Sequence, residues 1–253
     1  MSFSDALSFS DTLVQRLARA QHVAVLTGAG ISAESGVPTF RDADGLWQKF
    51  RPEELANVRA FLRNPELVQG WYAHRGEVIR EVAPNAGHYA LAELERMKPH
   101  VHLATQNVDG LHLEAGSTNV AELHGNLRRI YCIDCGTPAD EHDLVVIEEG
   151  EVARCTACGG LLRPDVVWFG EMLPEEAFAD AARAAMLADV YLSVGTSGAV
   201  YPAAGLPIEA KRHGAYVAEI NIQPSEIASH LDETVLGKAG EVLPALLQAI
   251  ADF

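Results

Sequence analysis

Short apolar segments that alternate with amphipathic stretches constrain the fold of this chain more than any other feature. The apolar segments at 23–26, 101–105, 189–194 and 216–220 predict strands. Between and around them, the spacing of apolar residues predicts helices at 11–20, 89–97, 174–187 and 203–213, and a last helix that carries Leu243, Leu246, Leu247 and Ile250. This alternation predicts an α/β fold built on a doubly wound, mostly parallel, Rossmann-like sheet.

Glycines or small polar residues follow four of the predicted strands. In a parallel sheet the carboxyl ends of the strands meet at one edge, and ligands bind in the crevice beyond them. We therefore expect one shared nucleotide crevice, formed by Gly28-Ala-Gly30, Gln106-Asn107, Gly195-Thr-Ser197 and Asn221.

The stretch Gly28-Ala-Gly-Ile-Ser32 has two interpretations that the residues alone leave open. Closely spaced glycines after a strand let backbone amides approach a pyrophosphate, but a tight turn without a ligand would have the same sequence. As a dinucleotide fingerprint it is incomplete, because Ala33 stands in place of the third glycine. A ribose-binding acid about 20 residues further on is also missing, which argues against an ordinary Rossmann dehydrogenase.

All four cysteines fall into two Cys-x-x-Cys pairs, Cys132/Cys135 and Cys155/Cys158. Two such pairs can place four thiolates tetrahedrally around one zinc ion, and a complete sulfur shell leaves no position for a substrate. We therefore predict a structural zinc ion in a small module, residues 131–160, inserted into the α/β domain. A redox dithiol would need only one pair.

The charge of the chain limits its partners. With 35 acidic and 19 basic residues, the net charge is −16, which disfavours nucleic acid and anionic membrane surfaces. The acidic excess favours cationic partners such as lysine-rich segments, or it serves solubility alone. We see neither a membrane-spanning segment nor a secretory signal in the sequence, so a cytoplasmic location is expected.

His124 stands out among the ten histidines of the chain because of its position. It follows a short apolar segment and precedes Gly125 and the cysteine module. A histidine near its ordinary pKa can remove a proton from a hydroxyl group at neutral pH. Taken separately, His124 and the stretch Thr105-Gln-Asn-Val-Asp109 are equally compatible with buried structural groups.

Together these stretches resemble the sirtuin family of NAD-dependent protein deacylases. The motifs occur in the order of the family, over residues 24 to about 239. They are Gly28-Ala-Gly-Ile-Ser-Ala-Glu-Ser-Gly36, Pro38-Thr-Phe-Arg41, Thr105-Gln-Asn-Val-Asp109, His124-Gly125, the four cysteines, Val167-Trp-Phe-Gly-Glu171 and Gly195-Thr-Ser197. The resemblance implies a single catalytic domain over residues 1–253, with NAD as co-substrate and acylated lysines of other proteins as substrates.

The resemblance also implies roles for individual residues. His124, Asn107 and Asp109 would be catalytic, with His124 as the general base that activates a ribose hydroxyl. Asp109 would also help to recognise the nicotinamide carboxamide. The acyl group would pass to ADP-ribose and nicotinamide would leave. The residues that would contact NAD are Gly28, Ala29, Gly30, Ser32, Phe40, Arg41, Gln106, Asn107, Asp109, Gly195, Thr196, Ser197, Asn221 and Ala239.

Tyr72 and Arg75 resemble the signature of the sirtuin branch that accepts succinyl- and malonyl-lysine, and Ala56 matches its small pocket residue. Side chains three residues apart share a helix face, and a guanidinium fork suits a carboxylate. In the other interpretation, Arg75 is a solvated residue that pairs with Glu77 or Glu81. The segment with Val166, Trp168 and Phe169 would pair with the substrate backbone as an added strand.

Two other functions use the same motifs. A protein ADP-ribosyltransferase would share the NAD site but transfer the other half of the cofactor. A non-catalytic NAD sensor with a zinc scaffold would bind NAD without releasing nicotinamide, although His124, Asn107 and Asp109 are all present. Tyr72 and Arg75 favour the deacylase, acting on both succinyl-type and acetyl groups.

Overall fold

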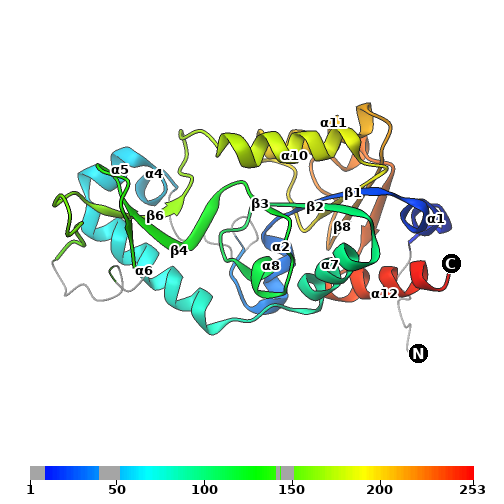
Figure 1. Ribbon diagram of the computed structural model, residues 1–253, viewed down its shortest axis with the longest axis horizontal. Coiled ribbons are helices and arrows are strands. Elements are labelled where there is room, and N and C mark those ends of the chain that lie inside the picture. The colour runs from blue at the N-terminus through cyan, green and yellow to red at the C-terminus, as the bar shows by residue number, and fades with distance from the viewer. Residues whose placement is uncertain (1–8, 40–51, 141–142, 144–150) are drawn as a thin grey trace.

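The computed structural model describes residues 9–39, 52–140, 143 and 151–253. The larger part of the described molecule is built around a parallel sheet with the strand order β3-β2-β1-β7-β8-β9 (Figure 1). This arrangement confirms the predicted α/β fold. The strands are β1 (His22–Thr27), β2 (His100–Thr105), β3 (Val120–Glu122), β7 (Val190–Val194), β8 (Tyr216–Asn221) and β9 (Glu233–Leu236).

Helices cover both faces of this sheet, which explains why its central strands are almost continuously apolar. Helices α1 (Asp11–Arg19), α7 (Ala86–Met97) and α12 (Ala239–Ala251) pack on one face. Helices α10 (Glu175–Leu187) and α11 (Leu206–Arg212) pack on the other. Shorter helical turns lie at α2 (Ala29–Ser32), η1 (Ala33–Ser35), α8 (Leu111–Glu114), η2 (Ala203–Gly205) and η3 (Ala228–His230).

Helix boundaries differ from the sequence prediction where capping or proline decides them. Helix α7 begins at Ala86, earlier than predicted, because the Asn85 side chain caps it and His88 completes a capping box. The segment predicted as one helix at 203–213 is divided into η2 and α11. Pro207 lies in the first turn of α11, where its missing N–H group costs no hydrogen bond.

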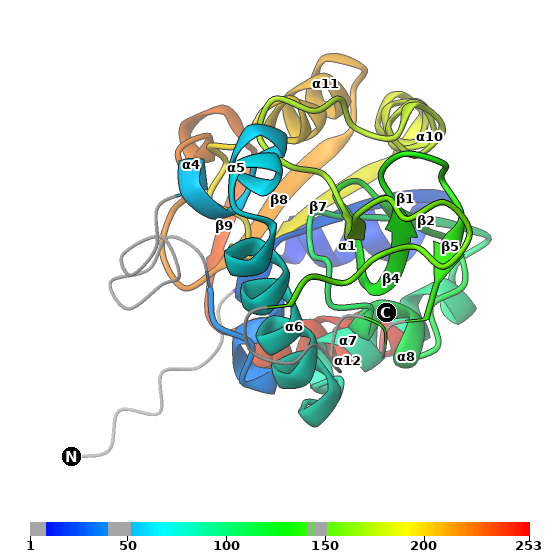
Figure 2. The ribbon, with the colours of Figure 1, turned by 90° about the vertical axis from the view of Figure 1, so that its left-hand side faces the viewer.

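The remaining elements form a smaller lobe, which lies beside the parallel sheet in Figure 1 and faces the viewer in Figure 2. An antiparallel sheet with the order β5-β4-β6 packs against three helices, largely through Phe61, Val68, Trp71, Leu127 and Trp168. The residues predicted as the zinc module, 131–160, begin inside β4 and end before β6, so the lobe is larger than that module. Its elements are α4 (Pro52–Leu55), α5 (Val58–Arg63), α6 (Pro65–Glu81), β4 (Gly125–Cys132), β5 (Pro138–Ala139) and β6 (Leu162–Val166).

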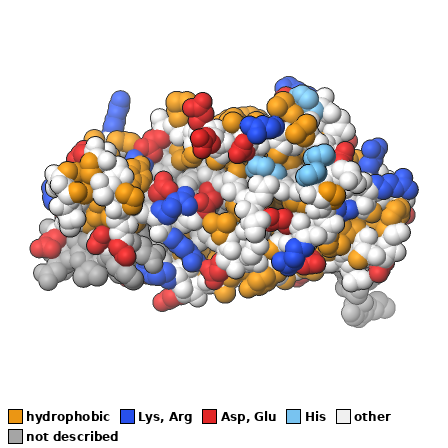
Figure 3. All heavy atoms as spheres, viewed as in Figure 1, with side chains coloured by type: hydrophobic (Ala, Val, Ile, Leu, Met, Phe, Trp, Pro, Cys, Tyr) orange, Lys and Arg blue, Asp and Glu red, His pale blue; other side chains and the backbone are white. Residues whose placement is uncertain are grey.

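The molecular surface carries both signs of charge. On the face shown in Figure 3, acidic and basic side chains are interspersed rather than gathered into one patch. Among the described residues, none of the helices has the length and apolar character needed to cross a membrane.

Candidate active site

A cavity of about 1040 Å³ lies at the carboxyl ends of the parallel strands and extends to the smaller lobe. It brings together residues from six strand ends and loops that are far apart in the chain, as the predicted crevice required. The predicted site residues that line it are Gly28, Ala29, Gly30, Ala56, Tyr72, Arg75, Gln106, Asn107, His124, Val166, Trp168, Phe169, Gly195, Thr196, Ser197, Asn221 and Ala239. Phe40 and Arg41 lie outside the described residues.

The glycines after β1 and β7 are explained by the contact between their two turns. The Gly28 N–H group donates to the carbonyl of Val194, and the Gly30 N–H group donates to that of Gly195, both at 3.0 Å. A Cβ atom on Gly30 would lie 2.7 Å from the Gly195 Cα, and Gly195 itself has a φ of 62°. Two of the amides expected to approach a pyrophosphate are therefore already used within the protein, and the tight-turn interpretation accounts for both glycines.

Asn107 lies on the cavity wall and is held by the first turn. Its Nδ2 donates to the Gly28 carbonyl at 3.0 Å and to Ser32 Oγ at 3.2 Å. The Ser32 hydroxyl in turn donates to Asp109 Oδ2 at 2.8 Å. Ser32 and Asp109 are both buried and do not line the cavity. Since a serine hydroxyl has one proton to donate, the expected contact of Ser32 with phosphate would require this hydrogen bond to change.

Asp109 is a buried carboxylate in this network. Burial raises the pKa of its carboxyl group, while hydrogen bonds from the Leu111 N–H group and the Ser32 hydroxyl oppose that rise. Its place next to Asn107 agrees with the predicted group around the nicotinamide, although contact with that ring stays a prediction.

Two histidines that the sequence did not single out for a role complete the buried network. His112 Nε2 lies 2.8 Å from Thr27 Oγ1, and His88 Nε2 lies 3.4 Å from Ser32 Oγ. Burial lowers the pKa of His88 to about 4 and that of His112 to about 3, so both rings are neutral at physiological pH. The only sequence signal for His88 was its place three residues after a capping asparagine.

His124 lies between β3 and β4 and faces the cavity. Its Nδ1 lies 2.9 Å from the carbonyl oxygen of Gln106, and an Nδ1–H donor at this distance leaves Nε2 as the proton acceptor. Burial lowers the pKa of the imidazole, and the hydrogen bond to Gln106 opposes that change. A neutral ring with a free Nε2 is what a general base requires.

Tyr72 and Arg75 both line the cavity from α6, as their spacing on a helix predicted. The Arg75 guanidinium lies over the Trp71 ring, 4.9 Å from its centroid. Burial lowers the pKa of Arg75, while Tyr72 and Asp109 raise it. Glu77, one of the acids proposed as an alternative partner, lies 3.8 Å from His74 Nδ1.

Three backbone N–H groups of the loop after β6, the segment predicted to pair with the substrate as an added strand, have acceptors within the protein. The N–H group of Val167 donates to the His124 carbonyl at 2.9 Å, and that of Phe169 donates to the Ala56 carbonyl at 2.8 Å. The N–H group of Trp168 donates to Glu171 Oε2 at 2.7 Å. Pairing with a substrate backbone at 167–169 would have to use the carbonyl groups, because these three donors are occupied.

The opposite end of the cavity is formed by the loops after β8 and β9. Asn221 Nδ2 donates to the Thr196 carbonyl at 2.8 Å, and the Thr196 hydroxyl lies 2.9 Å from Ser193 Oγ. Ile222, Gln223 and Lys238 also line the cavity and were not predicted. Only their position could have predicted this, because they lie just after the ends of the parallel strands β8 and β9.

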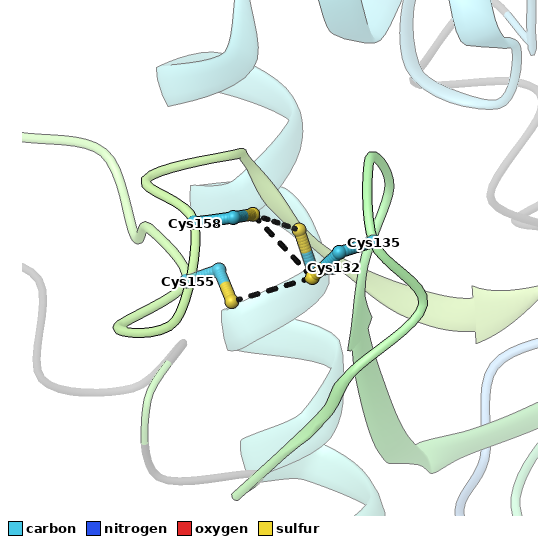
Figure 4. A group of neighbouring side chains, drawn as sticks. All are labelled: Cys132, Cys135, Cys155 and Cys158. Carbon is cyan, nitrogen blue, oxygen red and sulfur yellow. Dashed lines mark hydrogen bonds between the residues drawn. The ribbon is translucent and has the colours of Figure 1, made fainter.

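The four cysteine sulfurs form a compact cluster in the smaller lobe (Figure 4). All of them lie within 4.8 Å of one another, and Cys132 and Cys158 are 3.4 Å apart. A zinc ion with four Zn–S bonds of about 2.3 Å requires sulfur separations of about 3.8 Å. The donor set and its size therefore fit one zinc ion with a closed shell.

Glycines with positive φ end both cysteine turns. Gly136 and Gly159 follow Cys135 and Cys158 with φ of 70° and 78°. Their N–H groups donate to the carbonyls of Cys132 and Cys155, which closes each turn. The two pairs thus use the same local conformation to present their thiolates.

The fold and the site define a class of NAD-binding α/β proteins with a zinc-binding lobe. The model of the Sir2 family matches residues 28–202, and the chain belongs to this family, that of the sirtuins. NAD-dependent protein deacylase 2 of Pyrobaculum aerophilum is 53% identical over 238 residues, which cover 92% of this chain and 93% of the relative.

Solved structures agree with this assignment. A Sir2 homologue in complex with NAD aligns with a TM-score of 0.89 and 44% identity, over 97% of this chain and 95% of that one. A complex of Sir2 with a p53 peptide and NAD⁺ aligns with a TM-score of 0.86 and 28% identity, over 97% and 100% of the two chains.

Proposed function

We propose that this chain, as an NAD-dependent protein deacylase of the sirtuin family, removes succinyl and malonyl groups as well as acetyl groups from lysine side chains. The products would be nicotinamide, the free lysine and 2'-O-acyl-ADP-ribose. The observation that carries this proposal is that one cavity is lined by both glycine turns, by His124 and by the Tyr72/Arg75 pair. Residues 1–253 would form one catalytic domain, with the zinc module inserted into it.

The cavity has room and polar groups for NAD at the end formed by 28–30, 195–197 and 221. When bound, NAD supplies the ribose carbon to which the amide oxygen of the acyl-lysine adds as nicotinamide leaves. Asn107 and Asp109 would orient the ribose and the nicotinamide, because they are held against Ser32 by hydrogen bonds. An amide oxygen is a weak nucleophile, so such positioning and the exclusion of water must supply much of the rate.

His124 would take the proton of a ribose hydroxyl at Nε2. The carbonyl of Gln106 fixes the ring through Nδ1, and burial keeps the ring neutral and able to accept a proton. The hydroxyl oxygen would then bond to the acyl carbon, and the bond from that carbon to the lysine nitrogen would break, so that lysine leaves as the free amine. One water molecule is consumed, which supplies the oxygen and hydrogens that balance lysine, nicotinamide and 2'-O-acyl-ADP-ribose.

Tyr72 and Arg75 would recognise the distal carboxylate of a succinyl or malonyl group. Burial raises the pKa of Tyr72 to about 12, so its hydroxyl remains a proton donor. A guanidinium fork and a phenolic hydroxyl on one helix face can together donate several hydrogen bonds to a carboxylate. Proteins that carry acylated lysines would be the partners, as with the peptide bound by the structural relative described above.

The experiment is a comparison of matched acetyl-lysine and succinyl-lysine peptides with NAD, followed by mass spectrometry of the peptide and of acyl-ADP-ribose. We expect turnover of both, and a large loss of succinyl turnover relative to acetyl turnover in Arg75→Met. Arg63→Met is the matched control, because Arg63 is exposed on α5.

Acetyl turnover alone would refute the carboxylate pocket. If neither peptide reacts, the deacylase itself is refuted, and transfer of labelled adenylate to protein would then identify an ADP-ribosyltransferase.

A further inference from the structure

We infer that Trp168 is a positioning residue for acyl specificity, which directs the Tyr72 hydroxyl proton into the cavity through the hydrogen bond from its indole Nε1. The inference rests on the proposed recognition of acidic acyl groups by Tyr72 and Arg75. It assigns to Trp168 an indirect role, instead of the substrate contact expected from the sequence.

The small exposed area of Trp168 argues against a large direct contact between this side chain and the substrate. Trp168 lines the cavity, but only 1% of its surface is exposed, whereas 54% of the neighbouring Phe169 is exposed. A side chain buried to this extent acts on a ligand mainly through the groups that it holds in place. The group that Trp168 holds is the Tyr72 hydroxyl, because its Nε1–H donates to Tyr72 Oη at 2.9 Å.

This hydrogen bond determines what the Tyr72 hydroxyl can do. A phenolic oxygen has one proton to donate and can also accept. Since Trp168 supplies a donor, the Tyr72 proton must point away from the indole. Tyr72 is only 5% exposed, and among the described residues its hydroxyl proton has no hydrogen-bond acceptor. Buried donors are nearly always satisfied, so this one calls for an acceptor in the cavity, and the distal carboxylate of the substrate provides it.

The indole is itself held rigidly, as a positioning group must be. The Arg163 guanidinium stacks on its face, 3.6 Å from the ring centroid, and Phe61 packs at 5.1 Å. Arg163 donates to both carboxylate oxygens of Glu171, at 2.6 and 2.9 Å. Glu171 also accepts the Trp168 N–H group, so backbone and ring are both anchored. The indole ring is therefore held in one orientation, and its Nε1–H group in turn holds the orientation of the Tyr72 hydroxyl.

The test is a double-mutant cycle with Trp168→Phe and Tyr72→Phe, in which kcat/KM is measured for succinyl-lysine and acetyl-lysine peptides. Trp168→Phe removes the donor and keeps an aromatic ring. We expect the succinyl-to-acetyl ratio of kcat/KM to fall by about tenfold in Trp168→Phe, and to fall no further when the same change is made in Tyr72→Phe.

Two results would overturn the inference: an unchanged ratio in Trp168→Phe, or an equal fall in both backgrounds, which would mean that Trp168 acts only as a wall. Should Trp168→Phe fail to fold, 3-benzothienylalanine at position 168 keeps the shape, lacks the N–H group and is judged by the same ratio. Succinyl turnover by the unmodified enzyme tests the proposed function separately.

Discussion

Replacing Gln69 with Leu should lower the free energy of unfolding by about 3 kcal/mol. Gln69 lies on α6, has no exposed surface and connects this helix to the zinc-binding part of the lobe. Its Nε2 donates to the carbonyls of Ala153 and Leu162 at 3.0 and 2.8 Å, and its Oε1 accepts the Ala153 N–H group at 2.8 Å. Each such bond contributes about 1 kcal/mol, which sums to about 3 kcal/mol for the amide.

Urea unfolding of zinc-loaded protein, followed by tryptophan fluorescence, measures this change. Trp71 and Trp168 both belong to the core of the smaller lobe and therefore report on it. Gln248→Leu is the control, since Gln248 is exposed on α12 and its side-chain amide donates to the Asp252 carboxylate; it should change the free energy by less than about 0.5 kcal/mol. A loss below about 1 kcal/mol in Gln69→Leu would refute the view that this amide holds the lobe together.

Three further predictions concern zinc, the general base and acid stability. Cys155→Ala should lose zinc and unfold the smaller lobe, and full zinc content by elemental analysis would contradict the four-cysteine site. His124→Ala should lose nearly all turnover but keep NAD binding by calorimetry; in the unmodified enzyme the acidic limb of the rate profile should lie below pH 6.5, because burial lowers the pKa of His124. His88 and His112 should destabilise the fold in acid. Their folded pKa values of about 4 and 3 lie below the unfolded value of 6.5, so stability is full above pH 6.5 and falls as the pH decreases, by about 3 kcal/mol for His88 alone at pH 4. Urea midpoints that stay constant from pH 7 to 4.5 would contradict this.

Local sequence patterns were sufficient for four strands of the parallel sheet, β1, β2, β7 and β8, and for the location of the crevice; the two short edge strands, β3 and β9, were not predicted. Apolar runs such as Val23–Leu26 predict buried strands because such strands are covered on both faces, and β1 is buried from Val23 to Thr27. The zinc ligands could also be predicted from the sequence, because the spacing of the cysteines and the glycines that follow them is a local property. The smaller lobe could not, because α4, α5 and α6 pack on β4 and β6 through side chains that lie far apart in the chain, and no local pattern encodes these contacts.

By itself the sequence determined the fold class, the metal ligands and four of the strand ends that carry the site. Only the tertiary structure decided how the groups at those ends are used. Gly30 donates to Gly195, and Trp168 donates to Tyr72, 96 residues away. The physical reason is that a hydrogen bond or a close backbone approach requires two distant segments to be placed relative to each other within a few tenths of an ångström. Residue patterns encode only the periodicity of each segment and the face that it buries.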